Sequence, residues 1–120
     1  MVDELLSAEK GLIKTRFLIR RENVFCHEGS FTEAGLVENM AQTAAAGIGA
    51  KPSTDAKKPP VGFIGGIKNL KIYSYPKVGQ EITTTVEVLH EVFEASVVKA
   101  SVSLKDAVIA ECELKIFLIQ

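Results

Sequence analysis

The sequence predicts an α+β fold in which an antiparallel sheet wraps around one central helix. Sustained helical periodicity occurs in one segment only, residues 33–48. Most of the remaining chain alternates between apolar and polar residues, which is typical of half-buried strands. A helix of this length is marginal in water by itself. The strands must therefore cover its apolar face.

Length and charge set the limits of the interpretation. The 120 residues suit one domain, 1–120, with one modest core. A net charge of −1 leaves no electrostatic footprint for nucleic acid or anionic lipid. No apolar run approaches a membrane span and no signal-peptide pattern precedes the first strand, so we expect a cytoplasmic protein. Cys26 and Cys112 have no metal-ligand spacing; we expect two free thiols, with a disulfide between them as the alternative. We expect no metal and no cofactor.

The predicted helix is apolar over about half of its circumference. The apolar positions are Ala34, Leu36, Val37, Met40, Ala41, Ala44, Ala45 and Ile48. Glu38 and Gln42 lie one turn apart, just beyond one edge of that arc. The pattern indicates a helix buried on most sides, with an acid and an amide facing a close neighbour. The alternative for Glu38 is a solvated or ion-paired carboxylate.

Two strands are expected before the helix. Residues 1–7 resemble a strand or its lead-in, 9–11 form a turn signal, and 12–21 alternate as a half-buried strand. A loop at 22–32 then leads to the helix, with Ser30 or Thr32 available as the N-cap.

After the helix, residues 49–60 are polar and proline-containing, which predicts an exposed, mobile loop. Residues 61–75 form a long strand interrupted at Gly65-Gly66, where we expect a bulge or a close backbone approach. Residues 76–79 form a turn before the next strands.

The last forty or so residues predict an antiparallel meander of three strands joined by short turns, one of them at Lys105-Asp106. The expected inward positions are Ile82, Thr84, Val86, Val88, Val92, Val98, Ala100, Val102, Leu104, Val108, Ala110, Cys112, Leu114, Ile116 and Leu118. His90 shares the side of Ile82 and Val86, so we expect it to be packed or to lie in an interface.

This order of elements predicts the hot-dog arrangement, in which a curled sheet encloses one helix. The alternative is an unrelated α+β sandwich with the helix on one face. A sheet of about five strands leaves open edges and an uncovered patch, which favours dimerisation.

Several segments resemble the β-hydroxyacyl-acyl-carrier-protein dehydratases of the hot-dog fold. Residues 23–31 (NVFCHEGSF) and 38–42 (ENMAQ) are similar to the family's loop ending in Gly-His-Phe-Pro and to its helix motif Glu-x-Met-Ala-Gln. Residues 63–69 resemble its Gly-Ile-Asp stretch, and 75–80 resemble its Pro-x-x-Pro-Gly-Asp turn. Residues 2–4 resemble its Val-Asp-Arg, which usually follows a helix and loop that this sequence does not contain.

The departures from that family point to one of its branches. Ser30 occupies the position of the family's catalytic histidine, the spacing from there to Glu38 is shorter, and the proline-rich lead-in to the helix is missing. The segment 34–42 is similar to Ala-Gly-x-x-Glu-x-Met-Ala-Gln of the dehydratase-like proteins in aryl-polyene and flexirubin-type pigment clusters. Those proteins have a shortened loop without that histidine.

The resemblance implies an acid–base site. Dehydration of a β-hydroxyacyl thioester needs a base for the α proton and an acid for the leaving hydroxyl. In the family the histidine is the base, and the helix carboxylate of the other chain in the dimer handles the hydroxyl. Here Glu38 corresponds to that acid, and His27 is the candidate base if the shortened loop turns it inward. The alternative for His27 is an exposed loop residue.

The resemblance also implies substrate-binding positions at Gly35, Gln42, Phe63, Gly65 and Gly66. The alternative for Gln42 is a hydrogen bond to a neighbouring loop. The alternative for Gly65-Gly66 is plain strand curvature. An acidic acyl carrier protein is the implied partner. Residues that would receive it, or else meet water, are Arg16, Arg20, Arg21, Lys68 and Lys71.

Three functions follow. The first is a hydro-lyase for β-hydroxyacyl chains on acyl carrier protein, in fatty-acid or polyene biosynthesis. The second is a catalytically weak hot-dog subunit that binds acyl chains or pairs with an active, histidine-bearing dehydratase. The third is an acyl thioesterase, because some hot-dog hydrolases use a helix carboxylate as nucleophile or base. The resemblance implies a homodimer or a heterodimer with a related hot-dog chain.

Overall fold

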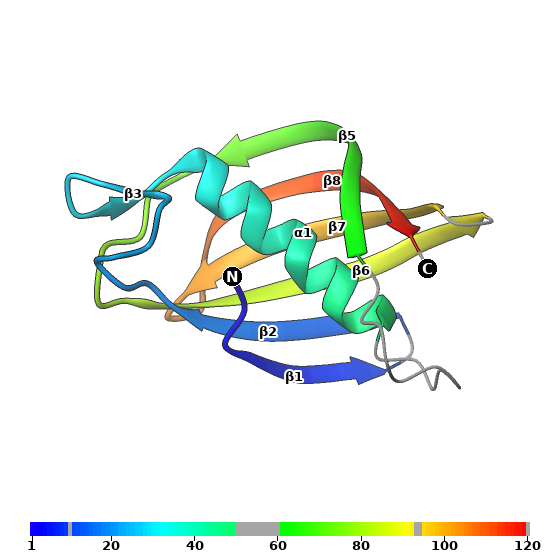
Figure 1. The fold of residues 1–120 in the computed structure, drawn as a ribbon, viewed down its shortest axis with the longest axis horizontal. Coiled ribbons are helices and arrows are strands. Elements are labelled where there is room, and N and C mark those ends of the chain that lie inside the picture. Colours follow the sequence, from blue (N-terminus) through cyan, green and yellow to red (C-terminus); the bar gives the residue numbers. More distant parts are fainter. Residues whose placement is uncertain (10, 50–60, 93–94, 120) are drawn as a thin grey trace.

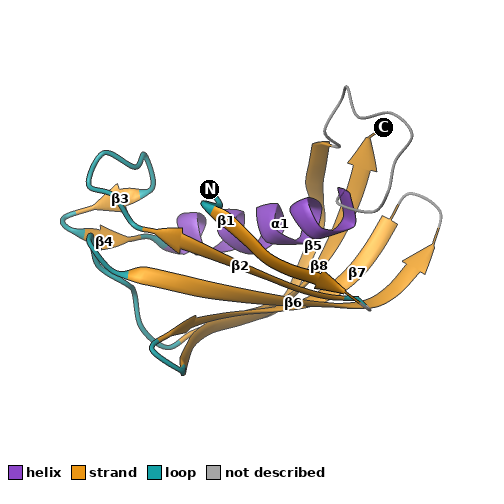
Figure 2. Ribbon diagram, turned by 90° about the horizontal axis from the view of Figure 1, so that it is seen from below, coloured by secondary structure: helices purple, strands orange, loops and turns teal. Residues whose placement is uncertain are grey.

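The computed structural model describes residues 1–9, 11–49, 61–92 and 95–119. The elements in chain order are β1 (Glu4–Glu9), β2 (Leu12–Leu18), β3 (Cys26–His27), β4 (Ser30–Phe31), α1 (Glu33–Gly49), β5 (Val61–Ile72), β6 (Glu81–Val92), β7 (Ala95–Leu104) and β8 (Ala107–Ile119). A six-stranded antiparallel sheet has the order β1-β2-β6-β7-β8-β5. This sheet curves around α1 (Figures 1 and 2). The predicted sheet around one helix is confirmed.

The connections explain the strand order. Strands β6, β7 and β8 form the predicted meander, and the β7–β8 turn has positive φ at Lys105 and Asp106, as a two-residue hairpin of type I′ requires. The helix carries the chain across the concave face, so that β5 pairs with β8 while β2 pairs with β6 (Figure 1). This path leaves β1 and β5 as the two edge strands of the sheet.

The helix begins one residue after its cap. The backbone N–H of Gly35 donates to Oγ1 of Thr32 at 3.4 Å, which makes Thr32 the N-cap rather than Ser30. The predicted span 33–48 matches α1 to within one residue. The predicted mobile loop 49–60 falls outside the described residues, apart from Gly49 at the helix end.

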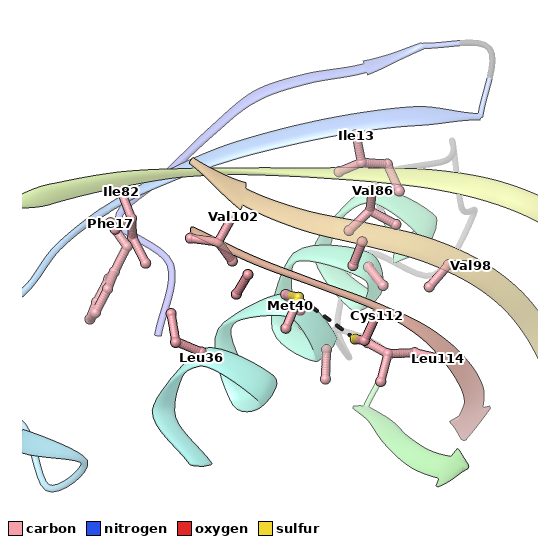
Figure 3. Packing of buried hydrophobic residues seen from close by; sticks show 14 of the residues in the cluster. Ile13, Phe17, Leu36, Met40, Ile82, Val86, Val98, Val102, Cys112 and Leu114 are labelled. Carbon is pink, nitrogen blue, oxygen red and sulfur yellow. Dashed lines mark hydrogen bonds between the residues drawn. The ribbon is translucent and has the colours of Figure 1, made fainter. Parts of the chain in front are cut away.

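The core lies between α1 and the concave face of the sheet (Figure 3). Leu36, Met40 and Ala44 of the helix are fully buried. They pack against inward residues of the sheet that include Ile13, Phe17, Ile82, Val86, Val98, Ala100, Val102, Ala110, Cys112, Leu114 and Ile116. Burial, together with Glu113, raises the pKa of the Cys112 thiol to about 11. Both cysteines are free.

Some positional predictions differ from the structure, two of them because the strands contain irregularities. A register shift between Val102 and Ser103 leaves Val108 46% exposed and buries Ile109 instead. A second shift, between Val88 and His90, leaves His90 exposed in the single chain, so it is not packed there, and its place in an interface stays a prediction. Ala34 is exposed, although it belongs to the predicted apolar arc. The bulge expected at Gly65-Gly66 is confirmed by the register shift between Ile64 and Gly66.

Candidate functional site

Glu38 lies in the second turn of α1, on the side of the helix that the sheet does not fully cover. Its side chain is half-buried, and Oε1 accepts a hydrogen bond of 2.8 Å from Nε2 of Gln42. This i, i+4 contact follows directly from helix geometry. It fixes the carboxylate while Gln42 itself stays exposed. The acid and amide are therefore adjacent, as the sequence predicts.

The loop before the helix contains a short hairpin that the sequence pattern did not reveal. Strands β3 and β4 are joined by Glu28 and Gly29, both with positive φ, and His27 is the cross-strand neighbour of Ser30. Cross-strand neighbours point to the same face of a hairpin. His27 thus lies beside Ser30, the residue that the resemblance aligns with the histidine of the wider dehydratase family.

His27 is nevertheless directed to solvent. Its side chain is 78% exposed, and its nearest ion-pair partner is Glu28, with 3.9 Å between Nε2 and Oε1. Within the described residues, no hydrogen bond or ion pair joins His27 to Glu38. In the described part of the chain, His27 and Glu38 are therefore not brought together into one site.

A buried polar network is centred on Asn39, the residue that follows Glu38 on α1. The side chain of Asn39 is fully buried; its Nδ2 donates to the backbone oxygen of Met1 at 2.9 Å, and its Oδ1 accepts from the hydroxyl of Thr84. Oγ1 of Thr43 donates to the Asn39 carbonyl at 2.8 Å and lies 2.7 Å from Oγ1 of Thr15. The network ties the helix to β2, β6 and the amino-terminal segment, so it fixes the rotation of α1 that presents Glu38.

Sequence reasoning missed Asn39 and Thr43 because only apolar residues were assigned to the buried arc. The signal was present in the spacing, since Leu36, Asn39, Met40, Thr43 and Gly47 follow the i, i+3, i+4, i+7 pattern of a buried face.

Replacing Asn39 with alanine is expected to lower the free energy of unfolding by about 1–3 kcal/mol, because the Thr84 hydroxyl and the Met1 carbonyl lose a buried partner. Urea unfolding monitored by circular dichroism gives the measurement. Gln42→Ala, at an exposed amide on the same helix, is the control and should stay within about 0.5 kcal/mol of the parent. Equal midpoints for Asn39→Ala and the parent protein would contradict the assigned network.

The glycines predicted to contact substrate have distinct surroundings. A Cβ on Gly35 would lie 2.7 Å from the Phe31 ring and 2.8 Å from Phe25, and one on Gly65 would lie 2.1 Å from the Phe117 ring. Close packing therefore explains both glycines without a ligand. Gly66 is exposed with open space around it, and the side chain of Phe63 is outside the described part of the structure. Substrate contact at these positions stays a prediction.

The basic residues considered for a carrier protein divide into two groups. Arg16 pairs with Glu4 and, at 3.0 Å, with Glu81, while Arg20 pairs with Asp3 at 3.0 Å. Burial acts to raise the pKa of Asp3, but the Leu18 N–H and Arg20 outweigh it and lower that pKa. Arg21, Lys68 and Lys71 are exposed and form no ion pair among the described residues.

Two further findings concern the described residues only. They contain no group of three or more His, Cys, Asp or Glu side chains that would hold a metal ion. They also contain no helix that is long and apolar enough to span a bilayer. The site built by these residues offers one carboxylate, its amide neighbour and nearby backbone groups for chemistry.

Comparisons with solved structures establish the fold. The dehydratase heterocomplex ApeI:P from Xenorhabdus doucetiae matches with a TM-score of 0.85 at 14% identity, covering 99% of this chain and 82% of that one. A Streptococcus mutans protein bound to acetyl coenzyme A matches at 0.71 and 12% identity, covering 97% and 87%. A hypothetical thioesterase with coenzyme A from Streptococcus pneumoniae matches at 0.72 and 11% identity, covering 97% and 84%. The predicted hot-dog fold is thereby confirmed.

Comparison with sequences gives the family. No curated protein sequence matches the chain. The family model described as "ApeP-like: ApeP dehydratase" matches residues 1–120. This agrees with the resemblance carried by residues 34–42 and with the shortened loop before them. The chain belongs to the ApeP-like dehydratase family.

Proposed function

We propose that this chain is a dehydratase subunit for β-hydroxyacyl chains carried by acyl carrier protein, in cytoplasmic fatty-acid or polyene biosynthesis. The observation that carries the proposal is the half-buried Glu38, held by Gln42 on the central helix of a dehydratase-family chain. In this role Glu38 supplies the acid, and a related hot-dog chain that bears the histidine supplies the base.

The reaction divides naturally between two such groups. The imidazole takes the α proton, the C–H electrons form the Cα–Cβ double bond, and the C–O bond breaks as protonated Glu38 gives its proton to the hydroxyl, which leaves as water. Backbone N–H groups near the start of α1 suit the thioester oxygen as it gains negative charge. The product is the 2,3-unsaturated acyl thioester.

A dimer is the assembly that this division of roles requires. Edge strand β5 carries long runs of exposed residues and an open row of backbone groups, which favours pairing with another hot-dog chain. The similar ApeI:P structure is itself a dehydratase heterocomplex. We therefore propose a heterodimer in preference to a homodimer, with part of β5 in the interface.

The lone chain is expected to dehydrate a β-hydroxyacyl carrier-protein substrate about 10²–10⁴-fold more slowly than the pair, because one positioned acid–base group is missing. Mass spectrometry of the carrier protein detects the loss of water. The chain is assayed alone and together with the hot-dog chains of its genomic neighbourhood that carry the histidine motif.

His27→Ala separates two versions of the proposal. No change in the rate of the pair assigns the base to the partner, whereas a large loss in a lone chain that is already active makes His27 the base. Ser30→Ala, its cross-strand neighbour, is the matched control. Release of free carrier-protein thiol without loss of water would instead establish a thioesterase and overturn the dehydratase role.

A further inference from the structure

The open edge of the sheet carries two lysines on one face because of an irregularity in β5. Lys68 is opposite Glu113 and Lys71 is opposite Glu111 of β8, with a register shift between them. In a regular strand, residues three apart point to opposite faces. The irregularity, at which Asn69 has φ 55°, turns both lysines to the outer face and leaves Leu70 packed against the core.

Lys68 ends a row of alternating charges that crosses the outer face, and Lys71 lies at the same edge in the neighbouring row, opposite Glu111. Cross-strand neighbours run from Glu87 of β6 to Lys99 of β7, Glu113 of β8 and Lys68 of β5. Opposite charges at adjacent positions stabilise each strand pair. The row stops at the open edge on a positive charge, and neither Lys68 nor Lys71 forms an ion pair among the described residues. The next strand in this row would complete the pattern with a carboxylate.

In a two-fold dimer a second copy of this chain brings its own β5 to this edge, and β5 supplies no carboxylate. The other edge strand, β1, carries Glu4 and Glu9, but pairing β1 with β5 is head-to-tail and does not give a two-fold dimer. Residues 61–75 read VGFIGGIKNLKIYSY, so Lys68 and Lys71 are the only charged side chains along the edge. In an antiparallel pair of two β5 strands, every register therefore adds positive or neutral side chains and no negative one. Like charges across a strand pair are destabilising.

We propose that Lys68 and Lys71 select the partner: they favour a related hot-dog chain whose edge strand carries Asp or Glu, and they disfavour self-pairing. The inference rests on the edge-to-edge assembly within the proposed function. The partner surface that fits this edge is an acidic edge strand, and repulsion between lysines is the reason for a heterodimer.

The test uses this chain only. A charge-reversed variant, Lys68→Glu with Lys71→Glu, is mixed one to one with the parent chain, which carries a mass tag, and the species are quantified by sedimentation and native mass spectrometry. The mixed pair is expected to associate several-fold more tightly than either chain associates with itself. The preference for the mixed pair should shrink at 0.5 M salt, because salt screens exposed charges. The Debye length falls from about 10 Å at 0.1 M to about 3 Å at 1 M ionic strength.

Two further variants make the result interpretable. Lys14→Glu with Lys99→Glu makes the same charge change on the outer face away from the β5 edge and is expected to give no pairing preference. Lys68→Gln with Lys71→Gln removes the repulsion without placing acids beside Glu111 and Glu113. It is expected to self-associate more tightly than the parent, and it serves if the reversed chain does not fold.

The proposal is overturned if the mixed pair is no tighter than the self-pairs, if the Lys14/Lys99 control shows the same preference, or if the neutral variant self-associates no better than the parent. None of these measurements involves substrate. A failed dehydratase assay and a failed pairing experiment are therefore separate results.

Discussion

Glu38→Gln is expected to reduce the dehydration rate of the active pair by about 10²–10⁴-fold, the typical contribution of a positioned acid–base group. Glutamine keeps the length and the planar end of the side chain, and its oxygen can still accept from Nε2 of Gln42, as the carboxylate does now at 2.8 Å. It has no ionisable proton to give to the leaving hydroxyl. The substitution therefore removes the chemistry and leaves the packing of α1 unchanged.

The control for this prediction is Glu33→Gln, which makes the same chemical change in the first turn of the same helix at an exposed position. It should leave the rate unchanged. Circular dichroism and the pairing state of both variants show whether the fold and the assembly survive. Full activity in Glu38→Gln, with the partner present, would mean that the catalytic acid lies elsewhere.

The fold was predictable from the sequence because its main signals are periodic. The 3.6-residue pattern defined α1 to within one residue, and the alternation of residues in the meander placed Ile82, Val86, Val98 and Val102 in the core. The glycine pair Gly65-Gly66 indicated the position of the bulge after Ile64. These features depend on residues that are close together in the sequence, so one sequence is enough to predict them.

The wrong predictions concern residues whose position depends on pairing between strands or on partners that are distant in sequence. Val108 was misplaced, and His90 is not packed in the single chain, because register shifts at Ser103 and after Val88 invert the alternation and no turn residue marks them. The helical spacing could have indicated the burial of Asn39, but not its hydrogen-bond partners, because Thr84 and Met1 are distant in sequence. Such partners are known only once the sheet is folded around the helix.

The candidate site was predictable only in part for the same reason. Glu38 and Gln42 are neighbours through helix geometry, so sequence spacing sufficed for them. The base is a different problem, since His27 stays exposed on its hairpin and, by the resemblance, Ser30 stands where the wider dehydratase family has its histidine. Under the proposed function the base comes from a second chain, and the spacing of residues in this chain carries no signal for it.

Met40→Ala is expected to lower the free energy of unfolding by about 2–5 kcal/mol, the usual range for removing a buried Met. Met40 has no exposed surface, and its Sδ lies 3.7 Å from Sγ of Cys112 on β8 (Figure 3). It fills the space between α1 and the middle of the sheet. Relaxation of the surrounding strands is limited because β7 and β8 are paired along almost their whole length.

Denaturant unfolding measures this loss as a lower midpoint with an unchanged slope. The control is Leu6→Ala on the exposed edge strand β1, which should stay within about 0.5 kcal/mol of the parent.

A larger side chain in the same part of the core gives a second test. Ala44, one turn further along α1, is also fully buried, so Ala44→Leu should overpack the core and cost about 1–3 kcal/mol. Unchanged midpoints in both core variants would mean that α1 does not pack inside the sheet, and the support for Glu38 would be lost with it.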